Sequence, residues 1–231
     1  MKLKLSLKFG ITFLALLFVM NEAHEIVHTT VGRIICGCWG KRDFNVWNLC
    51  SSCDGNPLGI LSTLAGPLFT FIMIWVGYTY LGKTKNDNQK SFGFALIFAN
   101  MPFARLLNPM LGGGDEMVVL MTFFEDYQTA RILTGVVIVL ITFIPLRKCY
   151  LIIQNKNKMG WFLLFYFIPV VLDLLIVLGI MNTLLDKGIL ADYWILGSPI
   201  LVTLWTLIVL LVFIITRKNI TTLGKSKNLT F

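Results

Sequence analysis

The chain has 231 residues, of which 56% are hydrophobic and only 14% are charged. Soluble domains average about 45–50% apolar and about 25% charged residues, so this composition excludes a disordered chain, a disulfide-stapled mini-protein and an ordinary water-soluble enzyme. The formal net charge of +8 comes from basic residues in short loops and tails beside apolar blocks. These basic residues do not form a stripe with interleaved aromatic residues, so we expect no nucleic-acid partner.

Six apolar blocks are each close to the roughly 20 residues that a helix needs to cross a hydrocarbon core. They cover residues 9–35, 58–82, 92–111, 130–147, 160–182 and 195–216. Because backbone groups in lipid must be hydrogen-bonded internally, we expect an all-α, polytopic transmembrane helix bundle that forms one integral-membrane domain over residues 1–231. The basic start of the chain resembles a signal peptide, but no A-x-A site follows Met20, so we expect the first span to be retained.

Lysine and arginine residues are unevenly distributed among the connecting segments. One alternating set of segments contains Lys2, Lys4, Lys8, Lys83, Lys85, Lys90, Arg147, Lys148, Lys156, Lys158, Arg217, Lys218, Lys225 and Lys227. The other set contains Lys41, Arg42 and Lys187. By the positive-inside rule, six spans with this distribution place both termini in the cytoplasm. We expect a multi-pass protein of a bacterial cytoplasmic membrane, with the lipid bilayer as its first partner.

The chain has two histidines, His24 and His28, which lie in the first span with Glu25 between them. Together they form the motif H-E-x-x-H. Side chains four residues apart share one face of a helix, with Cβ atoms about 5–6 Å apart, so the two imidazoles can bind one metal ion. Glu25 is then placed to act as the general base on water.

Zinc suits this motif, because catalytic zinc sites use three protein ligands and keep one position for water. Polar side chains in an otherwise apolar helix are costly, and Glu22 lies in the same helix as the motif. A metal ion would be a compensating partner for them. The alternative is a purely structural six-helix protein in which both histidines are hydrogen-bonded internally.

A third ligand must be a carboxylate or a thiolate, since no third histidine exists. Asp115 and Glu116 follow three glycines after the third span, and these glycines break the helix and allow close approach of the backbone. Asp173 lies inside the fifth span and is a candidate ligand, substrate contact or helix–helix hydrogen-bond partner. The alternative for Asp115 and Glu116 is a solvated pair of loop charges.

The order of motifs resembles that of the site-2 protease family of intramembrane zinc metalloproteases. The motifs are H-E-x-x-H, then Leu64-Ala65-Gly66-Pro67, Asn100-Met101-Pro102 and Gly113-Gly114-Asp115. The resemblance implies that His24, His28 and Asp115 are zinc ligands and that Glu25 is the catalytic base. It also implies that Asn100 binds the substrate backbone or the oxyanion.

The resemblance covers residues 10–125, so the chain divides into a protease-like core over 1–125 and three additional spans over 126–231. The family carries Leu-Asp-Gly where this chain has Gly-Gly-Asp115-Glu116, and Arg105 and Pro109 precede it here. Bacterial members of the family have their motif near the cytosol, whereas the charge distribution places this motif toward the outside. The orientation of the site therefore stays open.

Four of the five cysteines lie in a loop over residues 36–57, as Cys36, Cys38, Cys50 and Cys53. Outside the cytoplasm, two disulfides with any of three pairings are expected for this cluster. In the cytoplasm, the paired spacing would indicate a structural zinc site. Cys149 stands alone at a span end.

The sequence as a whole predicts a membrane-embedded zinc metalloendopeptidase that hydrolyses peptide bonds of a membrane protein or peptide. Glu25 is its general base, His24, His28 and Asp115 hold Zn²⁺, and Glu116 and Asp173 are secondary candidates. The alternative is a non-proteolytic metal-binding membrane protein, either a transporter or a pseudo-protease scaffold. A transporter is expected to have paired polar breaks in two symmetric halves, whereas the polar residues here concentrate in the first half. The substrate and the oligomeric state are not indicated by the sequence.

Overall fold

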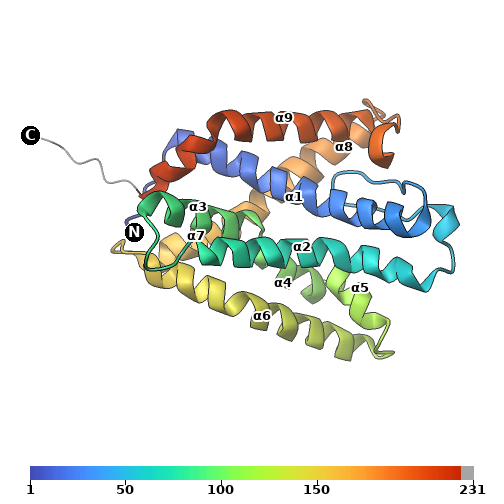
Figure 1. The fold of residues 1–231 in the computed structure, drawn as a ribbon, viewed down its shortest axis with the longest axis horizontal. Coiled ribbons are helices and arrows are strands. Elements are labelled where there is room, and N and C mark those ends of the chain that lie inside the picture. Colours follow the sequence, from blue (N-terminus) through green and yellow to red (C-terminus); the bar gives the residue numbers. More distant parts are fainter. Residues whose placement is uncertain (225–231) are drawn as a thin grey trace, which may run out of the picture.

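The computed structural model describes residues 1–224 of the chain (Figure 1). Its described part is helical and contains no β-strand, only two isolated bridge pairs. Five helices in this part are long and apolar enough to cross a membrane, and a sixth span results if one bent pair of helices is counted as a single span. The predicted all-α, polytopic bundle is thus confirmed. Lys225 and Lys227, which entered the orientation argument, lie outside the described residues.

The described residues, 1–224, form nine α-helices. They are α1 (Leu7–Cys36), α2 (Ile60–Thr79), α3 (Asp87–Ala99), α4 (Pro102–Met110), α5 (Asp115–Met121), α6 (Tyr127–Ile152), α7 (Lys158–Asp173), α8 (Asn182–Asp186) and α9 (Ile200–Thr216). The longest connections lie between α1 and α2 and between α8 and α9. Short 3₁₀-helices cover Ser51–Cys53, Pro57–Gly59, Ile195–Gly197 and Arg217–Gly224.

Helix α1 carries the H-E-x-x-H motif and is 30 residues long. It begins after Ser6, whose hydroxyl accepts a hydrogen bond from the Phe9 N–H at 3.1 Å and so satisfies a backbone donor that has no partner within the helix. It ends at Gly37, whose φ of 78° is the left-handed conformation that glycine adopts without a Cβ clash. Both histidines therefore lie in the second half of α1, toward the cysteine-containing loop.

The third predicted span, residues 92–111, is not one continuous helix. Helix α3 begins earlier, at Asp87, and ends at Ala99 because Pro102 lacks an N–H and disfavours a helical conformation in the residue before it. Met101 has a φ of 44°, and α4 starts at Pro102. Glycines then separate α4 from α5, which lies in a segment expected as a loop, and the chain bends by 47° between Asp87–Met110 and Asp115–Met121.

The fifth span also departs from a regular helix. Helix α7 ends at Asp173 and continues directly into a π-helix over Leu174–Met181 and then into α8. The π-helix is wider than an α-helix and is frequent at functional sites. It begins directly after Asp173, the polar residue that the sequence singled out in this span.

The connecting segments gather at two opposite ends of the bundle (Figure 1). At one end, the Met1 amino group donates to the Ile152 carbonyl at 2.7 Å, and the Lys4 N–H donates to the Leu223 carbonyl at 2.9 Å. At the other end, the Arg42 N–H donates to the Gly197 carbonyl at 3.0 Å. The described segments of the basic set all lie at the first end. The structure therefore places the two sets of connecting segments at opposite ends of the bundle, as the sequence predicted.

The additional spans share one core with the protease-like segment. Helix α9 packs along α1, while α7 contacts α1, α3 and α4. The rings of Phe9, Phe13, Phe94 and Phe98 surround Phe165 of α7, with centroid distances to it between 5.0 and 6.1 Å. Three of these contacts are edge-on, which is a favourable arrangement for aromatic rings, and the contact with Phe98 is tilted. Helices from before and after residue 125 thus contribute side chains to the same core.

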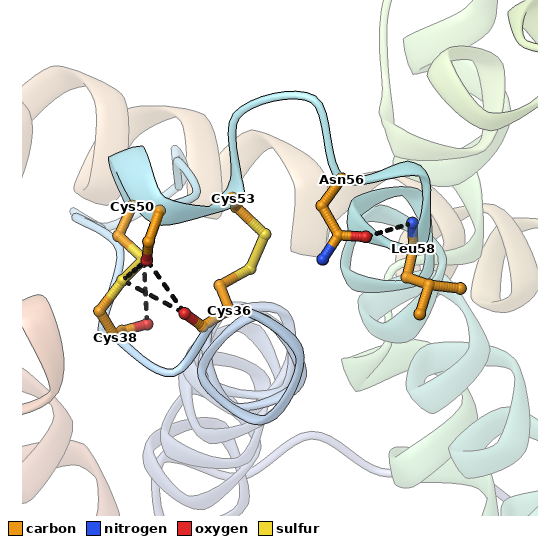
Figure 2. The surroundings of a disulfide bond; sticks show 7 residues. Cys36, Cys38, Cys50, Cys53, Asn56 and Leu58 are labelled. Atoms are coloured by element: carbon orange, nitrogen blue, oxygen red, sulfur yellow. Dashed lines mark hydrogen bonds between the residues drawn. A yellow bond between two sulfur atoms is a disulfide. The ribbon is translucent and has the colours of Figure 1, made fainter.

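The loop after α1 is cross-linked by two disulfides (Figure 2). Cys36 pairs with Cys53 and Cys38 with Cys50, with Cα–Cα distances of 5.1 and 6.2 Å. The sequence left disulfides and a structural zinc site open, and the structure has the disulfides. Beyond the cross-links, the Asn56 side chain accepts a hydrogen bond from the Leu58 N–H at 3.0 Å and leads the chain into α2.

Candidate metal centre

Three of the predicted ligands meet at one point in the bundle. The Nε2 atoms of His24 and His28 are 3.1 Å apart, and the Asp115 Oδ2 lies 3.3 Å from the first and 3.4 Å from the second. Zinc binds histidine nitrogen and carboxylate oxygen at about 2.0–2.2 Å, so neighbouring ligands of a tetrahedral ion are about 3.3–3.6 Å apart. The observed triangle is close to this spacing, and its donor set of two imidazoles and one carboxylate is one that zinc accepts.

Hydrogen bonds to α2 orient both imidazole rings. The Nδ1 of His28 is 2.6 Å from the backbone carbonyl of Ser62, and the Nδ1 of His24 is 2.9 Å from the hydroxyl of Thr70. A carbonyl can only accept a hydrogen bond, so the proton of a neutral His28 is on Nδ1 and the lone pair of its Nε2 faces the meeting point. Such an outer hydrogen bond is the usual support of a metal-binding histidine.

Gly66 provides the space that the His28 ring occupies. A Cβ atom at this position would overlap the imidazole at Nε2, Cδ2 and Cε1. Any side chain at residue 66 would therefore push His28 away from Asp115. This packing gives the glycine of the Ala65-Gly66-Pro67 motif a physical reason.

The cysteine-containing loop also packs on the His28 ring. The Trp47 indole stacks on the His28 imidazole, with centroids 4.6 Å apart and an interplanar angle of 14°. Phe44 of the same loop is fully buried. Trp47 was not among the predicted site residues, and the signal that could have identified it is an aromatic residue in the loop that follows the motif.

Glu25 lines a cavity of about 470 Å³ next to the three candidate ligands. The polar residues in its wall are Asn21, His24, Asn45, Arg105, Asn108, Asp115 and Asp173. Glu25 is 6% exposed, and within residues 1–224 its Oε2 has no hydrogen-bond partner. A buried carboxylate without a partner costs free energy unless a ligand, water or ion completes it. Glu25 thus has the placement of a group that acts on a molecule inside the cavity.

Arg105 of α4 lies beside the triangle and was not among the predicted site residues. Its Nη1 is 3.3 Å from His24 Nε2 and 3.7 Å from both Asp115 Oδ2 and Glu116 Oε1. The signal that could have identified it is its position in an apolar span, where an arginine is costly and usually functional.

The secondary candidates occupy different places. Glu116 is buried and lines a separate apolar cavity between α2, α5 and α6. Asp173 lies in the wall of the Glu25 cavity, 3.4 Å from the Asn21 amide. Asn100 ends α3, and its Nδ2 donates to the Leu96 carbonyl at 2.7 Å. Asn100 does not line the Glu25 cavity, so its predicted substrate contact stays a prediction.

Glu22, the other acidic residue of the motif helix, has a structural partner. Its Oε2 accepts hydrogen bonds from Arg42 Nη1 at 2.9 Å and from the Thr206 hydroxyl at 2.7 Å. The Arg42 Nε donates in turn to the Ser198 hydroxyl at 2.7 Å. This buried network connects α1, the cysteine-containing loop and α9, and it does not reach the three candidate ligands.

Comparison of the chain with protein-family models, with curated proteins and with solved structures gives no match. The resemblance to the site-2 protease family thus stays a prediction from the motifs.

Proposed function

We propose that the chain is a membrane-embedded zinc metalloendopeptidase that hydrolyses a peptide bond of a membrane protein or peptide. The observation that carries the proposal is the convergence of His24, His28 and Asp115 on one point, with Glu25 lining the cavity beside it. The two histidines lie in α1 and the aspartate lies in α5. His24 and Asp115 are 91 residues apart in the chain. Asp115 adds a third candidate ligand that the H-E-x-x-H sequence by itself does not supply.

The charge balance around the triangle also supports a divalent cation. Glu25, Asp115 and Glu116 contribute three carboxylates, and Arg105 contributes one guanidinium. When all three carboxylates are ionised, two negative charges would lack a partner in a region of low dielectric, where such charges are expensive. A dication held by His24, His28 and Asp115 would neutralise them.

The protein's own residues would divide the reaction between them. When bound, zinc supplies a Lewis acid and lowers the pKa of water toward about 7. Glu25 takes a proton from water as the water oxygen bonds to the carbonyl carbon and the π pair moves onto the carbonyl oxygen. Glu25 then gives this proton to the amide nitrogen, which leaves with the C–N electron pair. The products are a carboxylic acid and an amine.

The surrounding helices would keep this chemistry away from lipid. The cavity is lined by polar side chains from α1, α4, α5 and the cysteine-containing loop. These side chains can form hydrogen bonds with the backbone of a peptide inside the membrane. A helical substrate must unwind locally to present its carbonyl, and the cavity that Asp115 lines would receive the unwound segment.

The proposal includes a bacterial cytoplasmic membrane with the basic end of the bundle in the cytoplasm. The basic loops support this orientation by the positive-inside rule, and the disulfides at the other end suit an oxidising compartment. Tags on both termini should resist protease added to intact cells and be digested after lysis. A terminus that is digested in intact cells would contradict the orientation.

The decisive experiment uses the full-length protein in proteoliposomes with a labelled single-span peptide. Zinc content is measured by mass spectrometry, and cleavage is measured by release of the label. Glu25→Gln should retain zinc and lose cleavage, whereas His24→Ala and Asp115→Ala should lose both. Glu125→Gln is the matched control, because Glu125 is exposed in the loop between α5 and α6 and should change neither.

The outcomes separate the candidate functions. Full cleavage by Glu25→Gln would overturn the role of the base. Stoichiometric zinc in a wild-type protein that cleaves none of a panel of single-span peptides would favour the non-proteolytic alternative. A wild-type protein without stoichiometric zinc would favour the purely structural one.

A further inference from the structure

Arg105 places a positive charge next to the three candidate ligands. The residue is 8% exposed, and its guanidinium lies within 3.3–3.7 Å of His24, Asp115 and Glu116. Keeping a charged side chain at this depth of a membrane protein is costly, and such residues face the bundle interior or a cavity. Arg105 faces the cavity that Glu25 and Asp115 also line.

Most of the hydrogen-bonding capacity of Arg105 is unused. A guanidinium has five N–H donors, yet in the described part of the chain it makes one hydrogen bond, to His24 Nε2. Its Nε has no partner there. The two carboxylate contacts at 3.7 Å exceed the roughly 3.2 Å limit of a good N–H···O hydrogen bond. Donors of Arg105 are thus available to an acceptor in the cavity.

The one hydrogen bond that Arg105 makes competes with metal binding. His24 Nε2 has a single lone pair, which can accept an N–H or bind a metal ion. When His24 acts as a ligand, Arg105 must turn its donors to another acceptor. The cavity that Arg105 lines together with Glu25 and Asp115 offers space for such an acceptor.

We propose that Arg105 is a catalytic residue of the proposed peptidase and donates an N–H to the carbonyl oxygen of the scissile peptide bond. This inference rests on the proposed function. As the water oxygen bonds to the carbonyl carbon and Glu25 takes the proton, the π pair of the carbonyl moves onto that oxygen. A fixed cationic donor stabilises this developing charge more than it stabilises the neutral carbonyl, so it lowers the barrier rather than only binding the substrate.

Arg105 is better placed for this task than Asn100. The resemblance assigns the oxyanion or the substrate backbone to Asn100, but the Asn100 Nδ2 is engaged with Leu96 of its own helix. Asn100 is also absent from the wall of the Glu25 cavity, whereas Arg105 lines it. The break before Pro102 starts a new helix, and Arg105 lies one turn into that helix, which turns it toward His24.

The test compares Arg105→Gln and Arg105→Lys with Arg147→Gln, a control at an exposed arginine near the basic end of α6. All three variants should retain zinc. Loss of one oxyanion donor lowers kcat by about 10²–10³-fold, and we expect this for Arg105→Gln. Arg105→Lys keeps the charge and should recover part of the loss, while Arg147→Gln should match the wild type.

A second readout needs no turnover. In the Glu25→Gln background, the zinc-loaded protein is titrated with a phosphinic peptide, whose tetrahedral anionic group mimics the transition state, and with the uncleaved substrate. Arg105→Gln should weaken phosphinic peptide binding by about 10²-fold and substrate binding by much less, because the donor acts on developed charge.

Two results would overturn the assignment. One is unchanged kcat and unchanged phosphinic peptide affinity in Arg105→Gln. The other is loss of zinc in both Arg105→Gln and Arg105→Lys, which would make Arg105 a structural partner of Asp115 and Glu116. Failure of the proposed function looks different: the wild type would neither cleave the substrate nor bind the phosphinic peptide, and the Arg105 assignment would fall with it.

Discussion

The indole of Trp47 lies flat against the imidazole of His28, at a centroid distance of 4.6 Å. The same imidazole also lies against Gly66, which has no Cβ to displace it. Its Nδ1 donates to the Ser62 carbonyl. The ring is therefore held by the Trp47 indole, by packing against Gly66 and by one hydrogen bond, and its Nε2 faces the other two candidate ligands.

Replacing Trp47 by leucine should weaken the hold on a metal ion. Aromatic pairs contribute about 0.5–1.5 kcal/mol beyond burial, which corresponds to about a twofold to tenfold faster loss of zinc. Zinc transfer to a chelator measures this rate. Trp47→Phe should retain most of the effect of the ring, and Trp75→Leu, at a partly exposed tryptophan of α2, is the control. Equal rates for Trp47→Leu and the wild type would contradict the stacking role.

Replacing Gly66 by alanine should displace His28 and lower zinc content. Overpacking a filled site costs about 1–3 kcal/mol of stability. Gly135 on α6 offers a matched control, because a Cβ there meets no atom within 4 Å. Alanine is the better helix former by about 1 kcal/mol, so Gly135→Ala should be neutral or stabilising. Gly66→Ala should lower both the unfolding temperature in detergent and the zinc content, whereas Gly135→Ala should lower neither. Equal unfolding temperatures and zinc contents in the two variants would contradict the described packing of α1 on α2.

The Glu22–Arg42 pair should behave as one buried unit. Removing one partner leaves an uncompensated charge and costs about 3–5 kcal/mol, so Glu22→Met and Arg42→Met should each be strongly destabilising. The double variant should be more stable than the sum of the two single effects predicts. Lys41→Met, beside Arg42 but exposed, should have little effect on thermal unfolding. Additive single effects would show that the pair is not coupled.

The number of cysteines that react with an alkylating reagent should depend on unfolding and on reduction. The folded protein should take up no label, because Cys149 is buried and the other four cysteines are paired. The unfolded chain should take up one label without reductant and five with it. Peptide mapping should recover Cys36 linked to Cys53 and Cys38 linked to Cys50. Four free thiols together with two zinc ions per chain would instead establish the structural zinc site.

The helical spans could be predicted from the sequence because apolar length alone determines them. The first, second, fourth and fifth predicted spans match the helices closely, apart from boundaries that differ by a few residues. The third predicted span, residues 92–111, fails as a single helix because a helix breaker, Pro102, lies within its apolar run. Hydropathy averages over such residues, whereas backbone conformation depends on each of them.

The candidate site could be predicted only in part for a related reason. His24, Glu25 and His28 are adjacent in one helix, so their relation follows from helix geometry. The partner of Glu22 could not be predicted, since Arg42 reaches it from a loop whose path depends on tertiary packing. The same holds for Trp47 and Arg105, which reach the site from other segments.

The distance along the chain between His24 and Asp115 has a consequence for how the protein is made. Synthesis proceeds from the N-terminus, so α1 and α2 enter the membrane while residue 115 is still unsynthesised. At that stage two imidazoles are present without their carboxylate. If the three residues bind zinc as proposed, full metal affinity arises only when the third hydrophobic segment has been inserted and α5 has docked. If the chain is the proposed peptidase, a ribosome-bound chain that lacks α5 would be inactive, and cleavage could begin only after α5 had docked.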